Sequence, residues 1–266
     1  MTVDDGGGGK AAAFFDLDKT LMEGSSAFQF ARAAFKHGQM SRRQLARDVW
    51  ANVKFRLEGS TDEATAELRD RVFESLAGQR VVDLQRLTPD VLAGVLPRLY
   101  PQMLQVAWDH QEAGRPVFIV TAASQEMAEI LAHVLHFDGG IGSRSEVHDG
   151  VYTGKPAGPF TYREGKAEAI RQVAAELGFD LAESYAYSDS ESDLPMMRAV
   201  GHPVAVNPDS ELYRVARDEG WQIMRFDKLG RRLRIAVVAG GLALVGGGSG
   251  YAAARLRPRR RLGRLR

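Results

Sequence analysis

Residues 11–20 read AAAFFDLDKT, and this stretch predicts both a buried strand and a reactive site at its end. Its first five residues are apolar, which is typical of a short buried strand. Asp16 and Asp18 come directly after this run, and Thr20 follows them. In open α/β sheets the reactive groups gather beyond the carboxyl ends of the strands. Two carboxylates there can supply a nucleophile and a proton donor, which favours phosphoryl transfer through an aspartyl-phosphate.

Three later segments carry the remaining parts of such a site. A strand-like apolar stretch ends in the hydroxyl of Thr121, Lys166 lies near the start of a helical pattern, and a further strand precedes Asp189 and Asp193. A hydroxyl and an ammonium can hold phosphoryl oxygens as charge develops. The acids can hold Mg²⁺, which prefers carboxylate oxygens. Each residue alone is more typical of a cap, a turn or a solvated surface, and only the ordered combination favours a catalytic site.

With these motifs the chain resembles the haloacid dehalogenase superfamily, in the branch that includes phosphoserine phosphatase, over about residues 10–228. The resemblance implies that Asp16 is the nucleophile, that Asp18 is the general acid/base, and that Thr121 and Lys166 bind the phosphoryl group. It also implies a Mg²⁺ site made by Asp16, the backbone carbonyl of Asp18, and Asp189, with Asp193 supporting through water and Thr20 in a supporting position. An acid at position 18 argues against dehalogenation, because that reaction has no alkoxide to protonate.

The rest of the chain predicts an α/β fold with a doubly wound, mostly parallel, Rossmann-like sheet. Strands are expected at 117–121, 185–188 and 204–206, helices at 124–136, 165–178, 193–199 and 209–219, and a hairpin at 146–154 around Asp149-Gly150. The catalytic core is predicted to comprise residues 10–22 and 105–228, after a flexible glycine-rich start at 1–9.

Residues 23–104 interrupt this alternation of strands and helices. Helical periodicity occurs at 27–35, 45–57, 64–76 and 91–96, which predicts an all-helical insertion after the first strand. Such an insertion resembles the cap that the superfamily places between its first two core elements. A cap at this position would close over the site, exclude water and contact the part of the substrate beyond the phosphate. The alternative is a helical subdomain that does not touch the substrate.

The C-terminal segment, 229–266, differs sharply from the rest of the chain. Residues 231–266 contain ten arginines and no acidic residue, which leaves 25 basic and 34 acidic residues, a formal charge of −9, in residues 1–230. Residues 235–254 form a hydrophobic stretch of twenty uncharged residues, the length of a membrane span, although six of them are glycine. We predict membrane association through 235–266 and leave open whether this segment spans the membrane or lies on its surface. A nucleic-acid-binding tail is less favoured, because it has no need of the uncharged block.

The composition also limits where the protein works. The chain has 266 residues and no cysteine, so it forms no disulfide and gains nothing from an oxidising compartment. The first ten residues, MTVDDGGGGK, lack the apolar stretch of a signal peptide. These features predict a cytoplasmic catalytic domain attached to the cell membrane by its C-terminal segment.

The predicted activity is a Mg²⁺-dependent, phosphoserine-phosphatase-like phosphomonoester hydrolase, with a small-molecule or lipid phosphomonoester as substrate. Phosphoserine-specific relatives carry a glutamate five residues past the motif threonine, where this chain has Ser25, and Glu23 is the nearest acid. Ala122 and Ala123 stand where a glycine pair usually follows the second motif. The alternatives are a phospholipid or lysophospholipid phosphatase at the membrane, a non-turnover phosphoacceptor such as a receiver domain, and a scaffold with a dead site.

Overall fold

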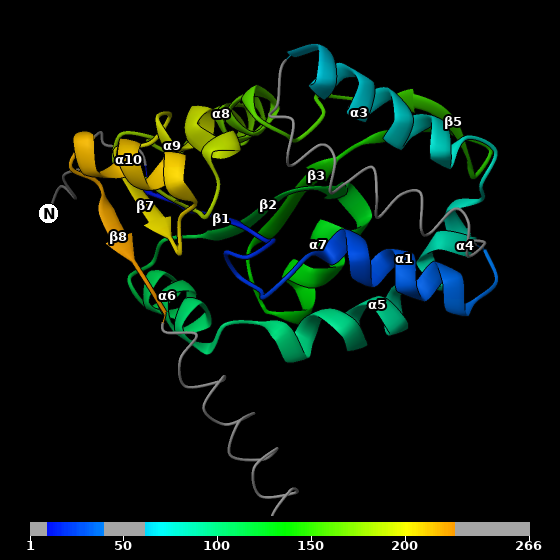
Figure 1. Ribbon diagram of the computed structural model, residues 1–266, viewed down its shortest axis with the longest axis horizontal. Coiled ribbons are helices and arrows are strands. Elements are labelled where there is room, and N and C mark those ends of the chain that lie inside the picture. The colour runs from blue at the N-terminus through cyan, green and yellow to red at the C-terminus, as the bar shows by residue number, and fades with distance from the viewer. Residues whose placement is uncertain (1–9, 40–61, 227–266) are drawn as a thin grey trace, which may run out of the picture. The chain divides into compact units, whose positions relative to one another are not determined.

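The computed structural model describes residues 10–39 and 62–226, and these residues contain one parallel sheet of six strands. The strand order is β3-β2-β1-β6-β7-β8, and every neighbouring pair is parallel (Figure 1). The strands are β1 (Ala13–Asp16), β2 (Val117–Ser124), β3 (Gly139–Ser143), β6 (Tyr185–Ser188), β7 (His202–Val206) and β8 (Gln222–Met224). This arrangement confirms the predicted α/β class with a parallel sheet.

Helices cover both faces of the sheet. The core helices are α6 (Pro101–Glu112), α7 (Gln125–Val134), α8 (Glu164–Leu177), α9 (Leu194–Met197) and α10 (Ser210–Asp218), with a single 3-10 turn, η2 (Glu191–Asp193), before α9. Because successive residues of a strand point to opposite faces, the contacts of Phe14 and Phe15 of β1 show which helices cover each face of the sheet. Phe14 packs in a cluster with residues of α8 and α9, whereas the ring of Phe15 faces His110 of α6. The sheet is therefore doubly wound.

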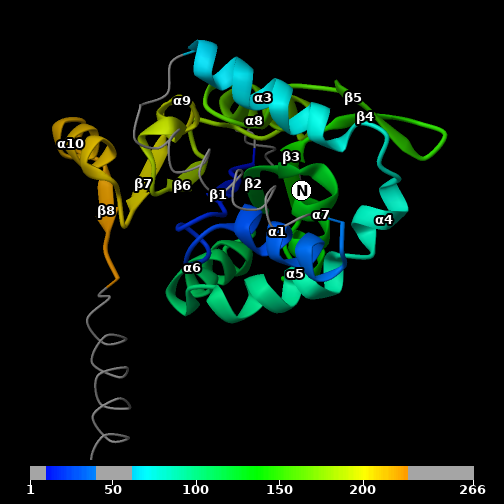
Figure 2. The same ribbon diagram turned by 45° about the vertical axis from the view of Figure 1, so that its right-hand side comes forward.

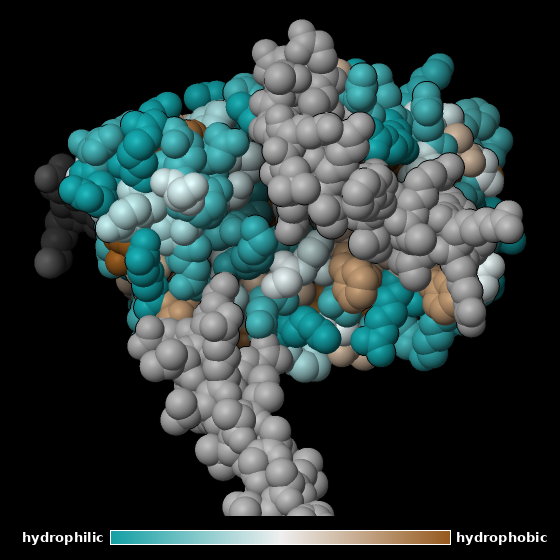
Figure 3. All heavy atoms as spheres, in the orientation of Figure 1, coloured by the Kyte–Doolittle hydropathy of each residue, from teal (hydrophilic) through white to brown (hydrophobic). Residues whose placement is uncertain are grey.

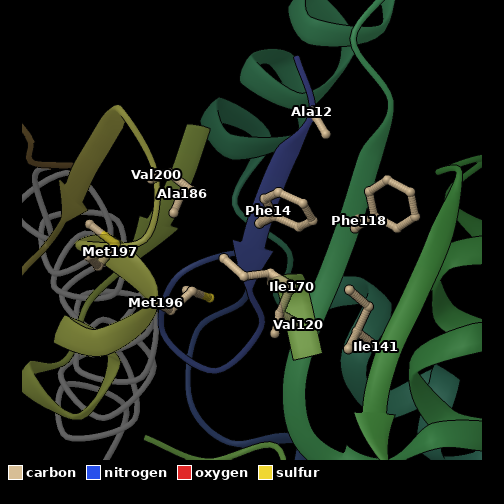
Figure 4. Packing of buried hydrophobic residues seen from close by; sticks show 10 residues of the cluster. All are labelled: Ala12, Phe14, Phe118, Val120, Ile141, Ile170, Ala186, Met196, Met197 and Val200. Atoms are coloured by element: carbon tan, nitrogen blue, oxygen red, sulfur yellow. The ribbon is translucent and has the colours of Figure 1, made fainter. Parts of the chain in front are cut away.

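The core on the α8 side is built around two stacked phenylalanines on neighbouring strands. Phe14 and Phe118 lie with their ring centroids 5.6 Å apart, and Ile170 of α8 and Met196 of α9 pack against the same cluster (Figure 4). β1 is buried over its whole length, which explains why its sequence is an unbroken apolar run and does not alternate. Burying one such side chain contributes about 1.5–3 kcal/mol, so this cluster fixes the strand that ends in Asp16.

Two strands of the sheet have no counterpart in the sequence-based prediction. β3 reads GGIGS, and its glycines lack the branched side chains that mark a strand. The structure gives the reason for the glycine at position 140: a Cβ there would lie 2.2 Å from the carbonyl of Ala128, so only glycine lets α7 pack directly on the strand. β8 follows α10 after a short turn. It has only three residues, and a strand of this length is too short for a recognisable sequence pattern.

Helices fill the described part of the segment between β1 and β2. They are α1 (Ser26–Lys36), α3 (Asp62–Leu76), α4 (Val81–Gln85), α5 (Thr88–Val95) and the 3-10 turn η1 (Leu96–Arg98). α1 lies beside α5, as both Figure 1 and Figure 2 show. The predicted helical stretch at 45–57 lies outside the described residues. α6 begins at Pro101 and is continuous across position 104, where the sequence-based prediction ends the insertion.

A hairpin connects the core to this helical segment. β4 (Ser145–His148) and β5 (Val151–Pro156) are antiparallel and turn at Asp149 and Gly150, both with positive φ, as the Asp-Gly pair predicts. β5 packs against α3 (Figure 2). Just after α3 ends, the amide of Gly78 donates to the carbonyl of Tyr152. The Tyr152 hydroxyl donates to Glu126 of α7. The hairpin is therefore bonded both to the helical segment and to the core.

The predicted membrane segment, 235–254, lies outside the described residues, and the first of two compact units of the chain ends at Met224. Among residues 10–39 and 62–226 no helix is long and apolar enough to cross a membrane. Hydrophilic residues cover most of the described surface on the face shown in Figure 3, and the hydrophobic residues there form small separate spots.

Candidate active site

The strand order places a topological switch point beside β1. From β1 the chain goes to β2 and then β3 on one side, and it later returns to β6 on the other side of β1. In doubly wound sheets the crevice at the carboxyl ends of such strands is the usual place for a ligand site. Asp16 is the last residue of β1, and Asp189 follows the last residue of β6. The two aspartates therefore lie at the same edge of the sheet, on neighbouring strands.

Lys166 joins two of the predicted site residues. Its Nζ donates to Oδ1 of Asp16 over 2.5 Å and to Oδ2 of Asp193 over 2.7 Å. All three side chains are buried, and Lys166 sits in the first turn of α8. The contact with Asp16 spans 150 positions of the sequence, so it depends entirely on the fold. Oδ2 of Asp16 takes no hydrogen bond from the part of the chain that the structure describes, which leaves this oxygen available for chemistry.

Asp193 is held by more hydrogen bonds than the sequence indicates. Besides Lys166, its Oδ2 accepts a hydrogen bond from the hydroxyl of Ser188 over 2.6 Å. Its other oxygen, Oδ1, is buried and has no hydrogen-bond partner among the described residues. A buried carboxylate oxygen without a donor is costly, so this atom calls for a water or a cation beside it.

Asp189 contacts a second lysine, Lys19, which comes from the turn after β1. The Nζ of Lys19 donates to Oδ2 of Asp189 over 3.1 Å. Asp189 itself is buried, whereas 47% of the Lys19 side chain is exposed. Neither the pairing nor the backbone conformation of Lys19, with φ at 62°, follows from a sequence pattern.

The remaining predicted residues are Asp18, Thr20 and Thr121. The first two follow Asp16 closely in the chain, and Thr121 lies on the neighbouring strand β2. Oδ1 of Asp18 accepts a hydrogen bond from the amide of Ser26, at the start of α1, over 2.8 Å. Thr121 is buried one residue beyond Val120, the register partner of Asp16 on the next strand, and its hydroxyl accepts from the amide of Ala123. Thr20 is fully buried, and its hydroxyl has no hydrogen-bond partner among the described residues.

The charges of this cluster do not balance without a further cation. Burial raises the pKa of Asp16; Lys166 opposes this effect, and repulsion from Asp193 and Asp189 adds to it. Burial also raises the pKa of Asp189, with Lys19 opposing. For Lys166 burial works against the charged form, but Asp16 and Asp193 outweigh it and raise the pKa of the ammonium. Lys166 therefore stays charged, and the carboxylates around it compete for too little positive charge.

The donor set fits Mg²⁺ even though it contains few carboxylates. Among residues 10–39 and 62–226 no group of three or more His, Asp and Glu side chains is arranged to hold a metal ion. The predicted set has only two side-chain carboxylates, Asp16 and Asp189, together with the backbone carbonyl of Asp18. Mg²⁺ is commonly held by one or two carboxylates while it keeps several waters. The buried and unpartnered Oδ1 of Asp193 provides an acceptor for such a water.

Two contributors to the site were not found from the sequence. Ser188 holds Asp193 and is the last residue of β6, in a run of serines and acids that carries no distinguishing pattern. Lys19 lies inside the motif that identified Asp16 and Asp18, but its partner Asp189 is 170 positions away. A lysine next to paired aspartates in a turn was the one available signal, and it points equally to a solvated surface residue.

Comparison with known families identifies the class of protein. The family model described as haloacid dehalogenase-like hydrolase matches residues 13–198. The chain belongs to this family, and it is an enzyme of the phosphatase class. The receiver-like phosphoacceptor and the scaffold are thereby disfavoured.

The names of individual relatives agree with this assignment, and a solved structure shares the fold. A phosphoserine phosphatase of Mycobacterium tuberculosis is 35% identical over 94% of this chain and 81% of its own length. A histidinol-phosphatase of Neisseria meningitidis is 28% identical over 82% of this chain and 99% of its own length. The crystal structure of a protein with unknown function from Bordetella pertussis Tohama I has a TM-score of 0.71 and 30% identity, and the match covers 81% of this chain and 98% of that chain.

Proposed function

We propose that this enzyme is a Mg²⁺-dependent phosphomonoester hydrolase that works through an aspartyl-phosphate on Asp16. The observation that carries the proposal is the contact between Asp16 and Lys166 at the switch point of the sheet. Lys166 holds Oδ1 of Asp16, and the other oxygen is left without a donor among the described residues. This arrangement orients a carboxylate for attack and places a fixed positive charge beside the reacting group.

The reaction then has two displacements at phosphorus. In the first, Oδ2 of Asp16 forms a bond to phosphorus, the ester P–O bond breaks, and Asp18 gives its proton to the leaving alkoxide. In the second, Asp18 takes a proton from water, the water oxygen bonds to phosphorus, and the bond to Asp16 breaks. Lys166 and Thr121 hold the non-bridging phosphoryl oxygens throughout. Thr20 and Asp193 support the site, Asp193 through its direct hydrogen bond to Lys166.

Mg²⁺ belongs to the same proposal. Asp16, the carbonyl of Asp18, and Asp189 would hold it, with Asp193 binding one of its waters. When bound, the ion would neutralise negative charge on the phosphoryl oxygens, which otherwise repel an anionic nucleophile. The excess of carboxylates over ammonium groups in the cluster supports this assignment.

For the substrate we propose a soluble phosphate ester that carries an ammonium group on the carbon next to the ester-bearing one. Phosphoserine and histidinol phosphate, the compounds in the names of the two relatives, share this unit. Helices α1 and α5 belong to the proposed cap, residues 23–104, which would cover the site and contact the rest of the substrate. Phosphoserine itself does not transfer as the substrate, because phosphoserine-specific relatives carry a glutamate that pairs with the substrate amine where this chain has Ser25.

The test is phosphate release from a panel of monoesters, with Mg²⁺ or with EDTA. The panel includes phosphoserine, histidinol phosphate, sugar and nucleotide phosphates, and lysophosphatidate. We expect release to require Mg²⁺ and to fall by about a thousandfold or more in Asp16→Asn, because the nucleophile is lost. Asp218→Asn, the same chemical change at an exposed carboxylate that is paired with Arg214 in the last turn of α10, outside the proposed cap, should leave release unchanged.

Turnover that persists in folded, purified Asp16→Asn would rule out Asp16 as the nucleophile. Release that is equal with Mg²⁺ and with EDTA would rule out the metal. A preference for lysophosphatidate over both amino phosphates would overturn the proposed substrate class.

A further inference from the structure

Lys19 is the feature of the site that the proposed function does not use. It lies between Asp18 and Thr20, in a left-handed backbone conformation (φ 62°) that a side chain with a Cβ rarely adopts. Its Nζ donates to Oδ2 of Asp189 over 3.1 Å. In the proposed function this carboxylate is a ligand of Mg²⁺. One oxygen of the proposed metal ligand is therefore already bound by a positively charged group of the chain itself.

The two lysines of the site are held in different ways. Lys166 is buried and bonded to two carboxylates, so it cannot leave without exposing both charges to an apolar interior. Lys19 has one carboxylate partner, and nearly half of its side chain is exposed. Its ammonium sits on a flexible four-carbon stem that can turn into water at little cost. Lys166 is therefore a fixed part of the site, and Lys19 is a removable one.

We propose that Lys19 is an internal counter-ion that competes with the divalent cation for Asp189 and so weakens cation binding. The inference rests on the proposed function, in which Asp189 is a metal ligand. A divalent ion at Asp189 repels the ammonium, so Lys19 must release Oδ2 when the ion binds. The energy of that lost ion pair is subtracted from the energy of cation binding. Without the ion, Lys19 supplies charge that the buried carboxylate needs.

The size of the effect follows from the exposure of Lys19. Ion pairs with a half-exposed partner are weak, and the repulsion is relieved once the ammonium turns into water. Removing the ammonium should therefore tighten cation binding by about twofold to fivefold.

The experiment measures cation affinity without turnover. Mn²⁺ serves as the probe, because carboxylate and carbonyl oxygens suit it as they suit Mg²⁺. Loss of the electron paramagnetic resonance signal of free Mn²⁺ reports binding to the full-length protein. We expect Lys19→Met to lower the dissociation constant about twofold to fivefold and Lys19→Arg to leave it near the wild-type value, because arginine keeps the charge. All three side chains carry a Cβ, so the backbone at position 19 is equally strained in each protein.

Lys36→Met is the matched control. Lys36 is also an exposed lysine paired with an aspartate, Asp90, at 2.6 Å, and its loss changes the net charge by the same amount. It should leave the Mn²⁺ affinity unchanged. An affinity in Lys19→Met equal to or weaker than that of the wild type would overturn the inference, and so would equal tightening in Lys36→Met.

Asp189→Asn separates this inference from the proposed function. If Asp189→Asn abolishes Mn²⁺ binding while Lys19→Met leaves it unchanged, the metal site stands and the role of Lys19 is wrong. If Asp189→Asn binds Mn²⁺ as the wild type does, the proposed metal site is wrong, and the inference about Lys19 falls with it.

Discussion

Two clusters of buried titratable groups flank β1, and the central group is charged in one cluster and neutral in the other. At the carboxyl end of the strand, Lys166 is charged and holds Asp16 and Asp193. On the face covered by α6, His110 is buried to the same degree and is held neutral. Burial penalises charge in both places. The two carboxylate partners of Lys166 outweigh the cost of burying its charge, whereas the hydrogen-bond partners of His110 include no carboxylate and burial keeps the ring neutral.

The second cluster consists of His110 and its hydrogen-bond partners Arg115 and Tyr187, and we call it the neutral cluster after the charge state of His110. Its hydrogen bonds fix the tautomer of His110. The Nε of Arg115 donates to Nδ1 of His110 over 2.7 Å, so the ring proton lies on Nε2. Nε2 then donates to the hydroxyl of Tyr187 over 2.7 Å. Burial lowers the pKa of His110 to about 4, and repulsion from Arg115 adds to this effect. Tyr187 stacks on Phe15, the residue before Asp16, with ring centroids 4.3 Å apart, so the neutral cluster supports the strand that carries the nucleophile.

The largest effect on stability is expected from breaking the charged cluster. Lys166→Met leaves Asp16 and Asp193 buried without their cation, which costs about 3–5 kcal/mol of unfolding free energy. Urea denaturation at neutral pH measures it, with Lys36→Met, an exposed lysine, as the control. If Lys166→Met lost no more stability than Lys36→Met, the buried carboxylates would not depend on Lys166 for their charge.

A smaller effect, with a defined pH dependence, is expected from the neutral cluster. The pKa of His110 is about 4 in the folded protein, against 6.5 for an ordinary solvated histidine, so the unfolded chain binds a proton first as the pH falls. His110 therefore lowers the unfolding free energy as the pH drops from about 6.5 towards about 4. Between pH 7.5 and pH 5 this loss amounts to about 2 kcal/mol.

His110→Gln removes the titrating group, so the variant should lose about 2 kcal/mol less stability than the wild type between these two pH values. Urea denaturation of both proteins at pH 7.5 and pH 5 makes the comparison, and the carboxylates common to both cancel in the difference. Equal losses in the two proteins would show that His110 does not titrate in this range and that the neutral cluster plays no part in acid sensitivity.

The sequence predicts the charged cluster better than the neutral one, for a physical reason. Asp16, Lys166 and Asp189 lie at the ends of strands or at the start of a helix, where residue type and position together indicate chemistry. The structure brings Asp16 and Lys166 into contact, while their catalytic roles stay predictions. His110 and Tyr187 are 77 positions apart, inside a helix and a strand, and no local pattern distinguishes them from ordinary core residues.

The elements of the fold also divide into those that local sequence predicts and those that it does not. The apolar run before Asp16, the Asp149-Gly150 turn and the helical pattern that contains Lys166 follow from local sequence, and the structure confirms the elements they predict. The glycine-rich strand β3 does not, because its glycines serve the close approach of α7 and not the strand itself. What local sequence misses is therefore set by contacts between distant segments.

The smallest of these effects is expected from Tyr187→Phe, which tests whether the neutral cluster needs its hydrogen bond. The phenylalanine keeps the stack on Phe15 but leaves the Nε2 proton of His110 without its acceptor, which costs about 1–2 kcal/mol of unfolding free energy. Tyr185→Phe is the control on the same strand, because the Tyr185 hydroxyl makes no hydrogen bond within the described residues and its ring stacks on His202. Urea denaturation at pH 7.5 measures both. A loss confined to Tyr187→Phe means that a buried neutral group depends on its partner as a buried charge does, only more weakly; equal stability of both variants would mean that packing alone keeps His110 in place.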